Sequence, residues 1–271
     1  MNTSVTKSIE NHNITNLTMT PLGLLVLLQI IGLVVCYPTK AIDLTWPFNN
    51  KTIAWDGSQK FEFTKIIAEE KPNGDWYSAK EFRVAEHAGT HLDAPYHLDK
   101  EGWKVGDIPL SNLMGNGIKV DVSNETEKLQ EKAMLLPKHL IDWESRHGPL
   151  PENAIVFIYF NWGRHYLNPT KYLGGDSAKD YKFPGVSIEA AQWLVDTGKV
   201  LGVGIDTASI DPGYATDLPV HKILCKNKSY LLENVKISET LPEKGFSVTV
   251  MPMLLGEGSG GPVRIVAYPS A

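Results

Sequence analysis

Residues 187–205 read SIEAAQWLVDTGKVLGVGI, and this stretch predicts a helix that leads directly into a strand. Ser187 is a typical helix N-cap, and the apolar residues after it recur at helical spacing until Gly198 ends the pattern. The run Val200–Ile205 that follows is β-like. A helix followed by a strand is half of a crossover unit, so the predicted fold class is α/β with a mixed sheet.

Further β-like runs lie on both sides of this stretch, at residues 61–67, 117–122, 154–159, 247–253 and 263–268. A second helix is predicted from Pro137 to Ser145. No repeat and no low-complexity linker interrupts the chain after Tyr37. We therefore expect a single α/β domain over residues 37–271, with β-sheet flanked by helices.

The composition excludes several classes of protein. The chain has 271 residues, of which 42% are hydrophobic, and its net charge is −5. An acidic chain is poorly suited to neutralising phosphates, so we expect no nucleic-acid partner. Cys36 and Cys225 are the only cysteines, too few for a disulfide framework or a cysteine-rich zinc site.

The segment Leu22–Cys36 is apolar over fifteen residues, which is the length of a signal peptide rather than of a membrane span. We expect residues 1–36 to be a signal peptide, with Met19 as an alternative start and Tyr37 near the mature N-terminus. The chain is then secreted and has no membrane attachment after cleavage. The alternatives are an uncleaved anchor and a buried core helix. Three glycosylation sequons beyond this segment fit secretion: Asn50-Lys-Thr52, Asn124-Glu-Thr126 and Asn227-Lys-Ser229.

Three histidines and an aspartate lie within eleven residues, in the run His87-Ala-Gly-Thr-His91-Leu-Asp93-Ala-Pro-Tyr-His97. His91 and Asp93 are two apart, so they leave the same face of an extended segment, and Gly89 lets the backbone turn so that His87 joins them. Two imidazoles and a carboxylate are a common ligand set for a catalytic divalent metal. The proline ends the strand, which places His97 beside the ligands as a candidate for proton transfer.

This H-x-G-T-H-x-D-x-P-x-H run resembles the signature of the cyclase family, which contains bacterial-type kynurenine formamidases and isatin hydrolases. The resemblance continues in Gly204-Ile-Asp-Thr-Ala-Ser-Ile-Asp211, which is similar to the family's G-x-D-T-x-S-x-D segment. It covers most of residues 42–271 and is weakest at 42–61, where the family's W-P-G-D is replaced by Trp55-Asp-Gly-Ser. With the leader, the chain is identified as an animal-type secreted member with the family's swivelling β/β/α fold.

The resemblance implies two divalent metal ions. His87, His91 and Asp93 would hold one ion, and Asp93, His221 and Glu233 would hold the other, so that Asp93 bridges them. The family typically binds zinc, and the same ligands also suit Mn²⁺.

The resemblance also implies an activity, arylformamidase, which converts N-formyl-kynurenine to kynurenine and formate in tryptophan catabolism. His97 matches the family's proton-transferring histidine, and Trp55 resembles the tryptophan that packs against the substrate's aromatic ring. The partner is then a small aromatic amide, and the family is commonly a homodimer. No G-x-S-x-G elbow occurs in the chain, which excludes the serine-hydrolase route.

Two other functions remain open. Hydrolysis of a cyclic amide or a lactone needs the same water and the same ions in a differently shaped pocket. A secreted, non-catalytic metal-binding protein of the same fold is the alternative outside enzymes. The glycine-rich run at residues 256–261 precedes a β-like run rather than a helix, so we expect a flexible turn near the site and not a nucleotide site.

Overall fold

The computed structural model describes residues 40–270. The expected signal peptide, its cleavage site and the alternative start at Met19 lie outside the described residues. Between residues 40 and 270, no helix is both long and apolar enough to cross a membrane.

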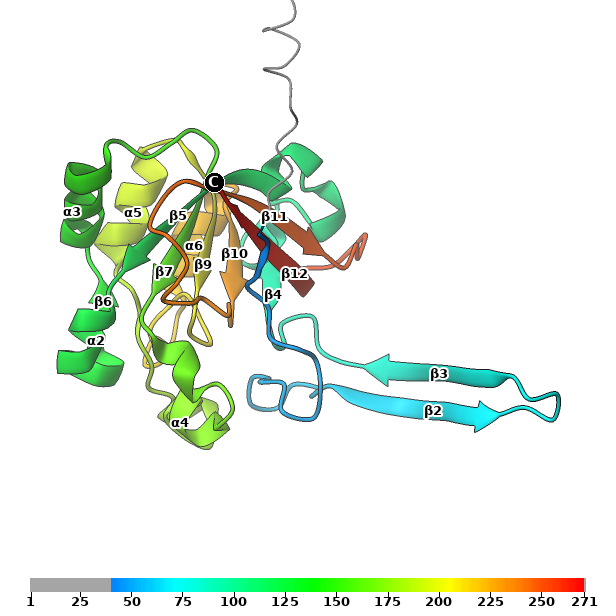
Figure 1. Cartoon of the computed structure of the whole chain (residues 1–271). Helices are drawn as coiled ribbons and strands as arrows, with labels where there is room; N and C mark the ends of the chain where they lie inside the picture. The colour runs from blue at the N-terminus through cyan, green and yellow to red at the C-terminus, as the bar shows by residue number, and fades with distance from the viewer. Residues whose placement is uncertain (1–39, 271) are drawn as a thin grey trace, which may run out of the picture. The chain divides into compact units, whose positions relative to one another are not determined.

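An eight-stranded mixed sheet forms the centre of the described chain (Figure 1). Its strands, in spatial order, are β1 (Ile42–Asp43), β12 (Gly260–Pro269), β11 (Phe246–Pro252), β5 (Met114–Asp121), β7 (Ala154–Tyr159), β9 (Val200–Ile205), β10 (Tyr230–Glu233) and β4 (His91–Asp93). Strands β5, β7, β9 and β10 pair in parallel, and the other pairs are antiparallel. This confirms the predicted mixed sheet.

The short strand β4 closes the sheet. It pairs with β10 on one side and with the first residues of β12 on the other, so the two ends of the sheet meet at β4. Residue Asp93 is opposite Leu231 of β10 and opposite Gly260 of β12. The strand that carries two of the candidate metal ligands is therefore hydrogen-bonded along both edges, which fixes the direction of its side chains.

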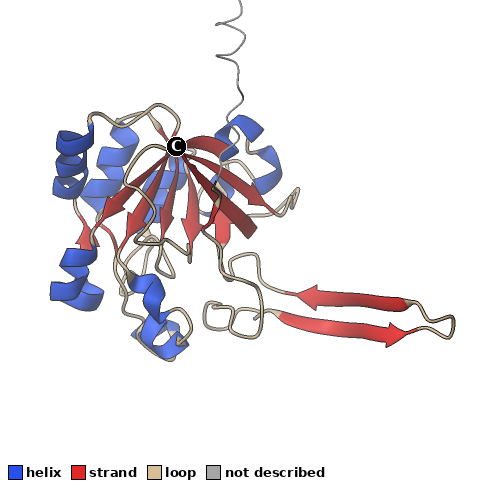
Figure 2. Cartoon of the chain, viewed as in Figure 1, coloured by secondary structure: helices blue, strands red, loops and turns tan. Residues whose placement is uncertain are grey.

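α-Helices cover one face of the sheet, and the 3₁₀ turns Val105–Asp107 and Leu110–Leu113 lie against the other (Figure 2). The helices of the described chain are α2 (Ser123–Leu129), α3 (Pro137–His147), α4 (Pro169–Leu173), α5 (Ile188–Asp196) and α6 (Pro219–Lys226). Side chains of α3, α5 and α6 share a core cluster with Val156 and Ile158 of β7. The alternate residues Ile155 and Phe157 face a second cluster on the other side of the sheet. Strand β7 is buried on both faces, which explains its continuous apolar sequence.

Two small sheets lie outside the main one. Strands β6 (Met134–Leu135) and β8 (Gly185–Val186) form a short parallel pair. Strands β2 (Glu62–Glu70) and β3 (Trp76–Arg83) form a long antiparallel hairpin that extends away from the eight-stranded sheet (Figure 1). Most residues of this hairpin are exposed on both faces.

The helix and the strand predicted within residues 187–205 are both present, as α5 and β9. Helix α5 begins after Ser187, whose hydroxyl accepts the N–H of Ala190 at 3.1 Å, as expected for an N-cap. The other predicted strands also form, within a few residues at their ends. Strand β3 lies outside the predicted β-like runs, as do β10 and the two-residue strands β1, β6 and β8; β3 pairs only with β2 and has no buried residue.

Candidate metal centre

The turn before β4 brings His87 back to the strand. Gly89 has a φ of +60° and its N–H donates to the carbonyl of Ile53 at 2.7 Å. A Cβ atom at this position would lie 2.8 Å from the ring of Phe48, so only glycine fits. The predicted turn at Gly89 is confirmed, and so is the end of the strand before the 3₁₀ turn Pro95–His97.

Glu233 reaches the same place through the sheet register. It is the last residue of β10 and lies directly opposite His91 of β4. Residues that face each other in an antiparallel pair project from the same side of the sheet. The Oε1 atom of Glu233 also accepts the N–H of Ile210 at 2.8 Å, which holds the carboxylate in place.

His221 comes from the first turn of α6. Asp211 accepts the backbone N–H groups of Val220 and His221 at 2.9 and 3.1 Å, so one carboxylate caps this helix. A third bond to the same carboxylate, 2.6 Å long, joins it to Nδ1 of the His221 ring. The helix end and the direction of the imidazole are therefore set by one buried residue.

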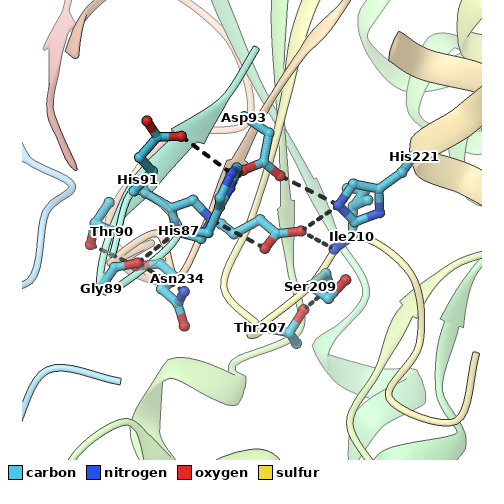
Figure 3. A network of polar contacts seen from close by, with 12 residues as sticks. His87, Gly89, Thr90, His91, Asp93, Thr207, Ser209, Ile210, His221 and Asn234 are labelled. Carbon is cyan, nitrogen blue, oxygen red and sulfur yellow. Dashed lines mark hydrogen bonds and ion pairs between the residues drawn. The ribbon is translucent and has the colours of Figure 1, made fainter. Parts of the chain in front are cut away.

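Three imidazoles converge on Asp93, as Figure 3 shows. The Oδ1 atom of Asp93 lies 2.5 Å from Nδ1 of His87 and 3.1 Å from Nε2 of His91. Its Oδ2 atom lies 3.4 Å from Nε2 of His221. Glu233 completes the group, with its two oxygens 3.5 Å from Nε2 of His91 and 3.2 Å from Nε2 of His221.

Each of these rings is held by its other nitrogen. Nδ1 of His91 bonds to the carbonyl of Gly89 at 2.9 Å, and Nδ1 of His221 bonds to Asp211. Nε2 of His87 lies 2.9 Å from the hydroxyl of Ser259. A second bond of this kind is typical of metal-binding histidines, because it fixes the tautomer and the orientation of the ring.

The donor set fits a divalent cation. Nε2 of His91 and Oδ2 of Asp93 are buried and have no hydrogen-bond partner within the described chain. Leaving such atoms unpaired is costly, and a cation between them removes that cost. Two ligand atoms on a tetrahedral zinc ion lie roughly 3.4 Å apart. Four facing distances here, from 3.1 to 3.5 Å, match that spacing, and the distance of 2.5 Å between Nδ1 of His87 and Oδ1 of Asp93 is shorter.

The carboxylates also dominate the protonation of the site. Burial alone lowers the pKa of His91, but Asp93 and Glu233 more than offset this and raise it to about 9. Burial favours a higher pKa for Asp93, yet the surrounding imidazoles, with His91 and His87 foremost, hold it well below its usual value. The site therefore attracts positive charge, as a metal centre must.

His97 differs from the other histidines of the site. Its ring lies 4.0 Å from the ring of His87, centroid to centroid, and no hydrogen bond anchors it among residues 40–270. Burial lowers its pKa, which favours the neutral imidazole. Two groups of donors have ligand atoms within 4.8 Å of one another: His87, Asp93 and His97, and His91, Asp93 and Glu233. Asp93 belongs to both groups, as expected. The sequence predicts that His91 shares an ion with His87, whereas in the structure His91 is grouped with Glu233.

A cavity of about 250 Å³ opens onto these residues. All seven residues singled out from the sequence line it: His87, His91, Asp93, His97, His221, Glu233 and Trp55. Trp55 forms the apolar wall together with Ile53 and Leu218, and its ring packs edge-on against Tyr181 at 4.9 Å. An isolated bridge between Ala54 and Ala88 holds this wall beside the metal ligands.

Several residues that shape the site had no role in the sequence analysis. Asp206, which is fully buried, accepts the N–H groups of Phe160 and Trp162 at 2.9 and 2.8 Å and so ties the end of β7 to β9. Asp211 orients His221. Both belong to the G-x-D-T-x-S-x-D segment. The sequence therefore showed the motif of Asp206 and Asp211, but it did not show which residues they contact.

The glycine-rich run at residues 256–261 differs from the expected flexible turn. Only its first residues form a turn, and Gly260 and Gly261 are buried in β12, paired with β4. The run continues into strand β12 and not into a helix. Cys225 is buried in the core and forms no disulfide within residues 40–270.

Comparisons with known proteins agree with this architecture. The Cyclase family model matches residues 42–212. The kynurenine formamidase of Bacillus anthracis is 26% identical over 238 residues, which cover 85% of this chain and 98% of that protein. Isatin hydrolase A from Ralstonia solanacearum has a TM-score of 0.79 and 26% identity, covering 94% of this chain and 100% of that one. Isatin hydrolase A from Labrenzia aggregata, bound to benzyl benzoate, also has a TM-score of 0.79, at 24% identity over 91% of this chain and 100% of that one.

The family match covers more than half of the chain and includes His87, His91 and His97 as well as Asp206 and Asp211. The fold resemblance extends over helix α6, which carries His221, and strand β10, which carries Glu233. On this evidence the chain belongs to the cyclase family.

Proposed function

We propose that this protein is a metal-dependent hydrolase of aryl amides, and that its substrate is N-formyl-kynurenine or a close analogue. The observation that carries the proposal is the convergence of three anchored imidazoles and Glu233 on Asp93, at the floor of a cavity walled by Trp55. The kynurenine formamidase of Bacillus anthracis, which is similar over most of both chains, supports the choice of reaction.

His87, His91, Asp93, His221 and Glu233 would hold the metal. Three imidazoles and two carboxylates are a donor set that suits Zn²⁺, and Mn²⁺ accepts the same ligands. When bound, divalent ions of this kind supply a water whose pKa is lowered towards about 7 and polarise the carbonyl of the substrate. The two oxygens of Asp93 face ring nitrogens of His87, His91 and His221, so we propose that Asp93 bridges two ions.

The remaining steps fall to side chains of the cavity. His97 is the one imidazole of the site with no anchoring hydrogen bond in the described chain, so its ring nitrogens are free to exchange a proton. We propose that it takes the proton of the attacking water and returns it to the departing aryl amine, whose bond to the formyl carbon breaks. Trp55 and Ile53 offer an apolar surface for the aromatic ring and exclude water from that side.

The test is to express the full chain, count its metal ions, and follow hydrolysis of N-formyl-kynurenine with and without a chelator. We expect close to two ions per chain and turnover that the chelator abolishes and added Zn²⁺ restores. Turnover that survives complete removal of metal would overturn the proposal. A chain that holds two ions and does not hydrolyse any amide would favour the binding role instead.

A second candidate is hydrolysis of a cyclic amide such as isatin. It is favoured by the likeness to isatin hydrolase A from Ralstonia solanacearum, which extends over 94% of this chain. Ring opening uses the same donors and the same proton transfer, so only the shape of the cavity distinguishes the two reactions. Parallel assays with N-formyl-kynurenine, isatin and an aryl lactone compare them directly through kcat/KM.

A further inference from the structure

The glycine-rich run has a contact with the metal centre that the proposed function does not use. Ser259 lies in this run, and its hydroxyl is 2.9 Å from Nε2 of His87. The same hydroxyl donates to Oε2 of Glu86 at 2.7 Å, and the backbone N–H of Ser259 donates to that oxygen at 3.1 Å. Hydrogen bonds therefore link Glu86, Ser259 and His87, and the other ring nitrogen of His87 faces Asp93.

The backbone brings Ser259 to this position because the neighbouring residues are glycines. A Cβ atom on Gly260 would lie 2.5 Å from Cε1 of His87, and one on Gly258 would lie 2.8 Å from the side chain of Leu255. The carbonyl of Ser259 accepts the N–H of Ala94, one residue after β4. This close approach is the structural reason for the glycines, and it fixes the serine relative to the metal ligands.

The direction of these bonds determines the tautomer of His87. A carboxylate only accepts hydrogen bonds, so the hydroxyl proton of Ser259 points to Glu86. The oxygen of Ser259 then accepts, and the proton on the His87 ring must be on Nε2. Nδ1 is left with its lone pair directed at Oδ1 of Asp93, 2.5 Å away. Two such acceptors repel each other unless a cation lies between or beside them.

We propose that Glu86 and Ser259 are positioning residues that hold His87 with its proton on Nε2, so that Nδ1 is the atom offered to a divalent ion beside Asp93. His91 and His221 offer Nε2 instead, because their Nδ1 atoms are bonded to Gly89 and Asp211. This inference rests on the proposed metal-dependent function. It gives a role to Glu86 and Ser259, which contact a metal ligand and not the metal itself.

His87 needs such a device more than the other two histidines. Its side chain is 27% exposed, compared with 2% for His91 and 3% for His221. A ring with open space beside it rotates easily and exchanges its two nitrogens. Ser259 connects the His87 ring to the half-exposed carboxylate of Glu86. These bonds restrain the rotation of His87, which burial restrains in His91 and His221.

A direct test is nitrogen NMR of the histidine rings in the full chain loaded with Zn²⁺, with the signals of His87 assigned by their loss in His87→Gln. We expect a proton on Nε2 of His87 and metal coordination through Nδ1. A proton on Nδ1 with coordination through Nε2 would overturn the proposal. This measurement requires no variant of the positioning residues to fold.

Variants test the chain of bonds itself. Ser259→Ala is expected to weaken Zn²⁺ affinity, measured by competition with a coloured chelator, by about tenfold to a hundredfold. Ser259→Thr keeps the hydroxyl and should remain within about threefold of the natural protein. Ser123→Ala is the matched control, because Ser123 also donates to a carboxylate, that of Asp121 at 2.7 Å, outside the residues that line the cavity.

The outcomes separate this inference from the proposed function. An affinity unchanged in Ser259→Ala, with amide hydrolysis intact, overturns the positioning role and leaves the function standing. Lower affinity in Ser259→Ala and Glu86→Gln, in a chain that hydrolyses no amide, supports the positioning role and overturns the function. A natural chain that binds no divalent ion overturns both.

Discussion

The metal centre and the β2–β3 hairpin use burial in opposite ways. At the centre, charged and polar side chains are buried: His91, Asp93 and Glu233 are 2%, 1% and 6% exposed. In the hairpin, large apolar side chains are exposed, with Ile66 at 60% and Trp76 at 68%. Buried polar groups must find partners, so they specify one arrangement. An isolated two-stranded hairpin is marginally stable, so its exposed surface is where we expect a partner.

The largest difference should appear when one aspartate is removed from each region. Asp93→Ala deletes the ligand that both donor groups share, and we expect it to lose its bound metal and all hydrolysis. Asp75→Ala removes an exposed aspartate from the hairpin turn and should leave metal content and turnover unchanged. Elemental analysis and amide hydrolysis measure both. Two ions retained in Asp93→Ala would refute the bridging role.

Next in size is the loss of proton transfer. His97→Ala removes the imidazole that has no anchoring bond in the described chain, and we expect kcat to fall by roughly 10² to 10⁴ while the metal content stays the same. His165→Ala, a histidine that does not line the cavity, is the matched control. The measurement is kcat alongside ion content. An active His97→Ala protein would contradict the assignment.

Stability gives a smaller contrast between buried and exposed carboxylates. Asp206→Ala leaves the N–H groups of Phe160 and Trp162 without their acceptor, and we expect a loss of about 3 kcal/mol in the free energy of unfolding. Glu81→Ala breaks the exposed ion pair with Lys65, 3.2 Å long, and should cost less than about 1 kcal/mol. Urea unfolding compares the two. Equal losses would show that burial does not decide the effect.

The smallest expected effect on catalysis comes from substituting an exposed apolar side chain of the hairpin. We expect the chain to form a homodimer, and the exposed Ile66 and Trp76 are candidates for its contact surface. Ile66→Ser is expected to weaken self-association by about tenfold, because burying such a side chain is worth roughly 1.5–3 kcal/mol. Metal content should not change. Sedimentation equilibrium measures this, and a natural chain that stays monomeric at all concentrations would contradict the homodimer.

Sequence reasoning worked best where the pattern is local. Helix α5 and its Ser187 cap follow from spacing within one segment, and so does the approach of His87 to His91 and Asp93 through the turn at Gly89. The glycine-rich run was less informative, because glycine indicates a close approach of another group but does not identify the residue that approaches. The contact of Ser259 with His87 joins residues 172 positions apart, which no local pattern contains.

By itself, the sequence determined the fold class, the ligand run on β4 and the family, because each depends on residue types at short spacing. Only the tertiary structure decided how His221 and Glu233 come close to His87, His91 and Asp93. It also decided which ring nitrogen of each histidine faces the other ligands. Those facts depend on β4 pairing with both β10 and β12, and on Asp211 and Ser259 reaching the outer nitrogens. Distant residues meet through the packing of whole strands and helices, so their geometry exists only in the folded chain.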